Sequence, residues 1–242
     1  MTEAEWLRCD DPGSMLSFLS GRVSDCKLRL FALACCERIG SLITDARSRA
    51  ALSFAEQHAH EDLTRQKGRI AVQKAAAAAA RELGARLTSF TRSDELPART
   101  AATAADAAVA VMRGNPLDAA RWASHLAAYS AAWSRAASSG AEPYHDAPYD
   151  LRRDEQEMQL PLLRDIFGNL FRPVTADPSW FTSTAATLAT GIYAERAFDR
   201  LPILADALED AGCANADILA HCRGGGEHVR GCWVIDLLLG KQ

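Results

Sequence analysis

The sequence has few of the signals that mark β-structure. Runs that alternate between apolar and polar residues are scarce, and hairpin dipeptides such as Asn-Gly are missing. The short apolar run CWVIDLLL lies inside a longer pattern of helical period. These absences argue against a sheet-based fold and predict an all-α protein.

An excess of one charge and a membrane-length apolar run are also lacking. Lys and Arg number 27 and Asp and Glu 31, and the formal net charge of −4 is spread along the chain. No apolar stretch reaches the roughly 18 to 20 residues that span a bilayer. The start, MTEAEWLRCDD, lacks the basic and apolar regions of a signal peptide. We therefore expect a soluble cytoplasmic protein that binds neither nucleic acid nor membrane.

Paired C-x-x-C motifs do not occur, although the chain has seven cysteines. An odd number of scattered cysteines in a reducing compartment predicts thiols instead of a disulfide framework. Most of these side chains should act as small core hydrophobes. They are Cys9, Cys26, Cys35, Cys36, Cys213, Cys222 and Cys232.

Helical periodicity is present almost throughout, and a chain of 242 residues that is 48% hydrophobic can bury a sizeable core. Thr2 and Glu5 have the spacing of a capping box at the start of a short helix. An alanine run at 75–80 suits a helix packed closely on its neighbours or a spacer. The pattern predicts helices near 24–43, 45–63, 64–90, 97–113, 155–167, 183–198, 201–211, 214–222 and 227–239, and another that starts at 116.

Two regions follow from a change in composition. The stretch SSGAEPYHDAPYD, residues 138–150, has no periodicity and is the best candidate linker. It separates an N-terminal helical region, 1–140, with an Ala-rich middle, from a compact C-terminal helical domain, 151–242. A row of large side chains before the linker is predicted to pack in the core and not to line a groove. Its members are Trp122, Leu126, Tyr129 and Trp133.

Several blocks resemble known families. LRLFALACCERI, LLRDIFGNLFRPVTADPSW, AERAFDRLPILADALEDAGC and ADILAHCRGGGEHVRGCWVIDLLLGK are together similar to a large, uncharacterised bacterial family. A fainter pattern resembles the repeat-companion domain, a helical module of unknown activity often found beside leucine-rich or similar repeats. That pattern covers Ala205, Asp206, Leu208, Glu209, Asp210 and Gly212, and Ala207 departs from the aromatic usual there. The resemblances imply a module without an established reaction.

The last block concentrates metal-binding residue types. His228 and Cys232 are four residues apart and would share a face of the last predicted helix, while His221 and Cys222 end the helix before it. The glycines between them allow a tight reversal, so four nitrogen and sulfur ligands could converge tetrahedrally on zinc. Cys35 and Cys36 could contribute from the N-terminal region. The spacing matches no established Cys/His finger, and core packing is the alternative for both cysteines.

Two other chemistries compete for the same block. Gly224 to Gly226, flanked by Arg223 and Arg230, could hold an anion at a helix N-terminus, but no strand precedes them and the Lys and Ser/Thr of a phosphate loop are absent. The alternative is a helix C-cap and a turn.

A thiol enzyme would use Cys232 with His228 and Asp236. Side chains on one helix seldom converge in that way, so no catalytic residue is predicted.

Charged residues in the apolar C-terminal helices are expected to form salt bridges and caps instead of a polar pocket. These are Arg164, Asp165, Arg172, Arg196, Asp199, Arg200, Asp206, Arg223, Arg230 and Asp236. The pair His58 and His60 is expected on a solvated surface.

The leading interpretation is a non-enzymatic module for protein–protein interaction or scaffolding, with an unidentified protein partner and no cofactor. The alternative is a structural or regulatory zinc protein that uses His221, Cys222, His228 and Cys232.

Overall fold

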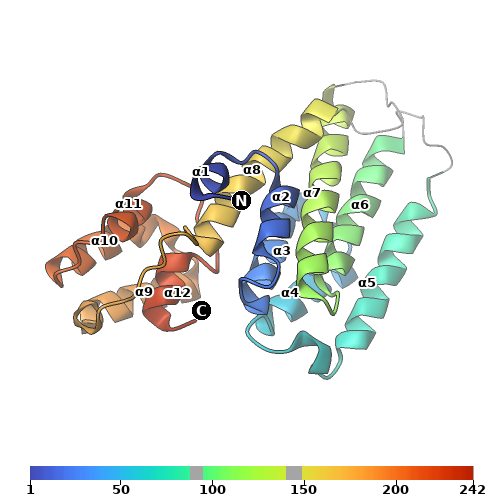
Figure 1. Cartoon of the computed structure of the whole chain (residues 1–242). Coiled ribbons are helices and arrows are strands. Elements are labelled where there is room, and N and C mark those ends of the chain that lie inside the picture. The colour runs from blue at the N-terminus through green and yellow to red at the C-terminus, as the bar shows by residue number, and fades with distance from the viewer. Residues whose placement is uncertain (88–94, 140–148, 242) are drawn as a thin grey trace. The chain divides into compact units, whose positions relative to one another are not determined.

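The computed structural model describes residues 1–87, 95–139 and 149–241, and the regular elements in these ranges are all helices (Figure 1). The predicted all-α, multi-helix fold is confirmed. No helix in this part of the chain is long and apolar enough to cross a membrane. Most of the predicted linker, residues 140–148, and the break at 88–94 lie outside the described ranges.

The α-helices follow one another along the described ranges (Figure 1). They are α1 (Glu3–Arg8), α2 (Pro12–Leu19), α3 (Asp25–Arg38), α4 (Ala46–Gln57), α5 (Arg69–Gly84), α6 (Leu96–Val111), α7 (Pro116–Ser139), α8 (Tyr149–Phe167), α9 (Ser183–Glu195), α10 (Leu201–Asp210), α11 (Ala216–Arg223) and α12 (Trp233–Leu239). Short 3₁₀ turns occur at Gly40–Leu42, Leu63–Arg65, Pro178–Trp180 and Phe198–Arg200.

The chain divides into two compact units. The N-terminal unit is Arg8–Leu160, and the C-terminal unit combines Met1–Leu7 with Pro161–Gln242. Helix α8 contributes its first turns to one unit and its last turns, from Pro161 on, to the other.

Side-chain caps begin helix α1, which the sequence predicts, and helix α2, which it does not, because Asp11-Pro12-Gly13 is typical of a turn. The backbone N–H of Thr2 donates to Glu5 Oε2 at 2.6 Å and that of Glu5 donates to Thr2 Oγ1 at 3.3 Å, which is the expected capping box. Asp11 accepts from the N–H groups of Gly13 and Ser14 at the start of α2. These bonds satisfy donors that a helix leaves free at its first turn, so the local sequence fixes these boundaries.

Alanine dominates the core of the N-terminal unit. Helices α6 and α7 pack along each other, α5 packs on α6, and α3 packs on α7 (Figure 1). Small side chains line the α6–α7 contact and let the two backbones approach closely. The buried alanines are 102, 104, 105, 107, 108 and 110 of α6 and 119, 120, 123, 127, 128, 131, 132 and 136 of α7. In the predicted alanine run of α5, Ala76, Ala79 and Ala80 are buried.

Two predictions about the N-terminal unit need correction. Helix α5 begins at Arg69 and ends at Gly84, whereas the sequence pattern predicted 64–90, because Leu63–Arg65 form a separate 3₁₀ turn capped by Asp62. The row of large side chains on α7 is only partly core. Trp133 is 5% exposed, but Trp122 is 46% exposed, and the guanidinium of Arg113 lies over its ring.

The C-terminal unit has its own apolar core. Helix α9 packs against α10 and α12, and α11 packs against α10 and α12. The core consists of Ala185, Ala189, Ile192, Leu201, Leu204, Ala205, Leu208, Cys213, Ile218, Cys222, Cys232, Val234, Ile235, Leu237 and Leu238. Five of the seven cysteines are buried and all seven are free, in accord with the prediction that most act as small apolar side chains.

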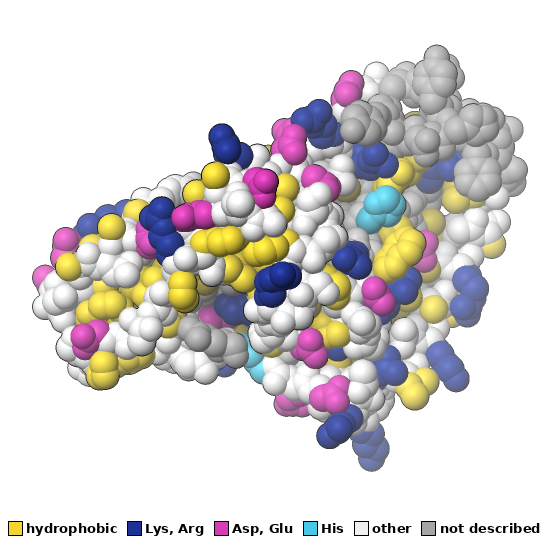
Figure 2. Space-filling view, viewed as in Figure 1, with side chains coloured by type: hydrophobic (Ala, Val, Ile, Leu, Met, Phe, Trp, Pro, Cys, Tyr) yellow, Lys and Arg dark blue, Asp and Glu magenta, His cyan; other side chains and the backbone are white. Residues whose placement is uncertain are grey.

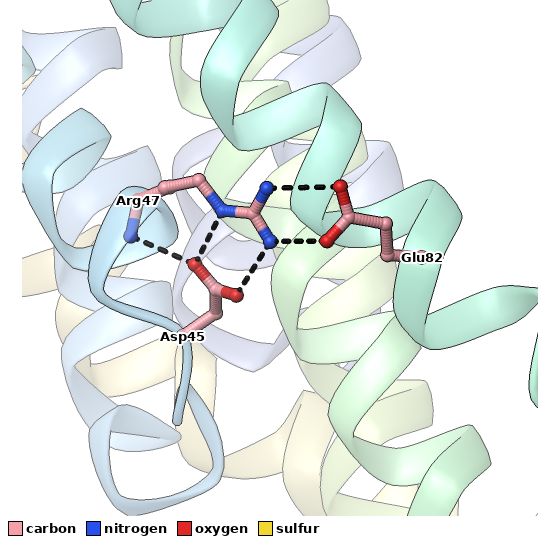
Figure 3. Close-up of polar contacts among 3 residues, drawn as sticks. All are labelled: Asp45, Arg47 and Glu82. Carbon is pink, nitrogen blue, oxygen red and sulfur yellow. Dashed lines mark hydrogen bonds and ion pairs between the residues drawn. The ribbon is translucent and has the colours of Figure 1, made fainter.

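Charges of both signs are interspersed on the face shown in Figure 2. On the N-terminal unit, one local network joins α4 to α5 (Figure 3). Arg47 donates to Asp45, the N-cap residue of α4, at 3.1 and 3.0 Å, and to Glu82 of α5 at 3.0 and 2.6 Å. The bidentate contacts hold the start of α4 against α5.

Replacing Glu82 by Gln tests this network through its pH dependence. Hydrogen bonds from Arg47 lower the pKa of Glu82, so the unfolded chain binds more protons than the folded chain as the pH falls. The stabilisation is therefore present above the usual Glu pKa of about 4.3 and is lost as the pH falls through the lower folded value. We expect Glu82→Gln to reduce the thermal unfolding midpoint slightly at pH 7 and to have no effect at about pH 2 to 3. Equal effects at both pH values would contradict the assignment.

Candidate metal centre

Three of the four sequence-predicted metal ligands converge in the C-terminal unit. His221 lies in the last turn of α11, Cys232 is the N-cap residue of α12, and His228 lies in the segment between the two helices. Asp165, in the last turn of α8, joins them. One ligand atom from each of the four residues lies within 4.8 Å of the others.

The shortest contacts of the cluster centre on one carboxylate oxygen. Oδ1 of Asp165 is 2.6 Å from His228 Nδ1 and 3.1 Å from His221 Nε2. His221 Nε2 is also 3.2 Å from Cys232 Sγ. The two imidazoles meet edge to face, with ring centroids 4.9 Å apart and planes at 80°. Two nitrogens, one oxygen and one sulfur therefore lie in one small group, within 4.8 Å of one another.

The cluster is largely closed to water. The side chains of Asp165, His228 and His221 are 3%, 9% and 17% exposed, and Cys232 is fully buried. An ionised carboxylate at such a depth needs a compensating positive charge and hydrogen bonds. The arrangement thus selects for a cation, either protons on the imidazoles or a metal ion.

Backbone groups orient two side chains of the cluster, on the side away from the other members. The N–H of Val229 donates to Asp165 Oδ2 at 2.9 Å, which leaves Oδ1 directed at the cluster. Nε2 of His228 is 3.4 Å from the carbonyl oxygen of Gly224 and can donate to it, which leaves Nδ1 facing Asp165. Such partners on the far side of a ligand fix its orientation and tautomer in metal sites.

The pKa values reflect the same geometry. Burial alone would raise the pKa of Asp165, but hydrogen bonds and charge from His221 and His228 outweigh it and the pKa is lowered. Burial would lower the pKa of His228, but its contact with Asp165 raises it. For the Cys232 thiol, burial and the Asp165 charge both raise the pKa well above its usual value. A bound cation would favour the thiolate and would compete with the proton of His228.

Cys222 does not join the cluster, although the sequence placed it among the four ligands. It is fully buried in the apolar core of the C-terminal unit, and burial raises the pKa of its thiol to about 12. Consecutive residues of a helix point in directions about 100° apart, so His221 can face the cluster while Cys222 faces the core. Cys35 and Cys36 belong to α3 and are not part of the cluster either.

Asp165 is the residue that sequence reasoning missed as a ligand. The sequence places it among charged residues expected in salt bridges. Its signal was local: a single acid in the block LLRDIF, next to the fully buried Ile166 and close to the fully buried Leu162 and Leu163. A carboxylate on the apolar side of a helix needs a specific partner, and spacing alone could not name it.

The last helix begins later than predicted, and this removes the helical arrangement on which both competing interpretations were based. Helix α12 starts at Trp233 and not at Glu227. His228, Cys232 and Asp236 therefore do not lie along one helical face as a thiol enzyme would need. Gly224 is the C-cap of α11, so the glycines follow a helix and do not precede a helix N-terminus.

The salt-bridge interpretation holds for some of the charged residues named from the sequence. Arg172 lies 2.7 Å from Glu3 and Arg200 lies 3.0 Å from Glu195, whereas Arg164 and Arg230 donate to backbone carbonyls. Arg223 donates to Asp206 at 2.8 Å and to Glu209 at 2.5 Å on the surface of α10. Elsewhere, His58 lies 3.2 Å from Glu61 and His60 lies 3.1 Å from Cys26, both in the N-terminal unit and outside the cluster.

One glycine holds the end of α8 beside the cluster. Gly168 has φ of 62°, and a Cβ there would lie 3.0 Å from the Trp233 ring, whose centroid is 5.2 Å from that of His221. We expect Gly168→Ala to destabilise the protein by about 2–4 kcal/mol, from the left-handed backbone and the collision together. Gly212→Ala is the matched control, because Gly212 also has positive φ but has no atom within 4 Å of the added Cβ. Its cost should be about 1–2 kcal/mol in chemical denaturation. Equal losses would rule out the Trp233 contact.

No family model, curated protein or solved structure matches the chain. The chemistry of the cluster therefore rests on its own atoms and their surroundings.

Proposed function

We propose that this protein binds one divalent metal ion of the zinc class through Asp165, His221, His228 and Cys232. The observation that carries the proposal is the convergence of four ligand atoms within 4.8 Å, from residues 67 positions apart at the extremes of the set. Close packing of two imidazoles, a thiol and a carboxylate at one buried point has a ready explanation if a cation holds them together.

The donor set favours zinc over other abundant divalent ions. Magnesium and calcium prefer oxygen ligands throughout, whereas zinc accepts imidazole nitrogen, thiolate sulfur and carboxylate oxygen in tetrahedral geometry. Zinc–ligand bonds of about 2.0–2.3 Å place neighbouring ligand atoms roughly 3.3–3.7 Å apart. The three shortest contacts, 2.6, 3.1 and 3.2 Å, must lengthen to reach these values, and the widest separations in the group, which extend up to 4.8 Å, must shorten by about 1 Å.

A thiolate ligand also fits the reducing cytoplasm that the sequence analysis predicts. The wider role as a protein–protein interaction or scaffolding module, the cytoplasmic location and the family resemblances remain predictions. Metal binding is compatible with each of them, because a structural ion supports a fold whatever surface that fold presents.

Elemental analysis of protein purified without added metal or chelator tests the proposal. We expect about one zinc per chain in the wild type. Cys232→Ser and His228→Ala should lose most of it, because each removes a donor. Cys222→Ser is the matched control: it changes a buried cysteine ten residues from Cys232 that is outside the cluster and should retain the metal.

Cobalt(II) titration of wild-type protein gives a second measurement that needs no variant. Tetrahedral coordination with one thiolate should produce visible d–d bands and a sulfur-to-cobalt charge-transfer band, both bleached by excess zinc. Protein that takes up neither zinc nor cobalt would overturn the assignment, and so would a Cys222→Ser variant that keeps the wild-type circular dichroism but loses zinc as fully as Cys232→Ser.

A further inference from the structure

We infer that the metal acts as a clasp: it orders the segment from Gly224 to Cys232 and makes the folding of the C-terminal unit dependent on metal. The inference rests on the proposed zinc site and concerns what occupancy of that site controls. It assigns the ion a structural role instead of a catalytic one.

The burial and number of the ligands point to a closed site. Four protein donors complete the tetrahedral coordination of zinc, whereas a catalytic ion keeps a position for water or substrate. Asp165 is 3% exposed and His228 is 9% exposed, so a substrate would have little access to the ion. The remaining carboxylate oxygen of Asp165 is already bonded to the backbone of Val229.

The ligands join parts of the chain that are distant in sequence. Asp165 lies in the last turn of α8, His221 lies in the last turn of α11, and Cys232 is the N-cap residue of α12. A cross-link between such positions restricts the unfolded chain, in the way that a disulfide closing a long loop does. One ion would thus hold together three helix ends. Ordering the chain that links them costs conformational entropy.

The segment between α11 and α12 has little intrinsic order. Gly224, Gly225 and Gly226 are exposed, and Gly231 has φ of 101°. Glycine loses more conformational freedom on folding than any other residue. Two of the contacts that hold this segment end on the cluster itself, since both Val229 N–H and His228 Nδ1 meet the Asp165 carboxylate.

The helices on either side of the segment are short. Helix α11 has eight residues and α12 has seven, below the roughly 12 residues at which an isolated helix becomes marginally stable. Cys232 at the N-cap of α12 makes no side-chain capping hydrogen bond. These helices therefore depend on tertiary contacts, and α12 supplies Val234, Ile235, Leu237 and Leu238 to the core of the unit.

The N-terminal unit is built differently and serves as an internal control. Its helices α6 and α7 have 16 and 24 residues, and its described residues hold no comparable group of metal-binding side chains. Removal of the metal should leave it unchanged.

Hydrogen–deuterium exchange of the full-length protein, zinc-loaded and then treated with a zinc chelator, tests the clasp. At a free zinc concentration 100 times Kd, bound metal lowers the population of locally unfolded states that disrupt the site by about 100-fold. Chelation should therefore speed exchange on the order of 100-fold in peptides that cover α11, the 224–232 segment and α12. Peptides from α6 and α7 should be unaffected, and added zinc should restore the protection.

Metal content measured on the same samples separates the two proposals. A chain that binds no zinc refutes the site and the clasp together. A chain that binds zinc and gives it up to the chelator, with unchanged exchange in α11 and α12, refutes the clasp and leaves the site. If chelation also speeds exchange in α6 and α7, the claim that the metal stabilises only the C-terminal unit is refuted. Cys222→Ser should respond to zinc and chelator as the wild type does, whether or not the ligand variants fold.

Discussion

The buried carboxylate of Asp165 is the constraint on which the C-terminal unit depends. It contacts both imidazoles with one oxygen and the backbone of Val229 with the other, so it links the end of α8 to α11 and to the chain before α12. A charge at this depth is unfavourable unless all its partners are in place. The positions of three segments are therefore coupled, and loss of one contact weakens the others.

The helical fold was predictable because the signals that set it are local. The reciprocal bonds of Thr2 and Glu5, and the alanine-rich pattern of α6 and α7, depend on neighbours a few residues away. The start of the last helix was not predictable in the same way. Residues 227–232 continue an apolar spacing typical of a helix, but His228 and Val229 face Asp165 through tertiary contacts that override that local preference.

The candidate site shows the same division between local and distant information. His221, His228 and Cys232 lie within twelve residues, so their chemistry was visible in one stretch of sequence. That stretch could not show that Asp165 takes the place predicted for Cys222. This depends on how α11 is rotated and on a residue 56 positions before His221. Composition can suggest which donors a site uses, but the packing of helices determines which of them meet.

At the alanine contact between α6 and α7, the N-terminal unit should tolerate smaller side chains better than larger ones. Positions such as Ala104, Ala107 and Ala127 are fully buried and have almost no side-chain volume to give up. Shortening them removes a single methyl group, whereas any larger residue must push two long helices apart over several turns. Sequence drift along this contact should therefore stay within Ala, Gly and Ser, while the outward faces of the same helices remain free to vary.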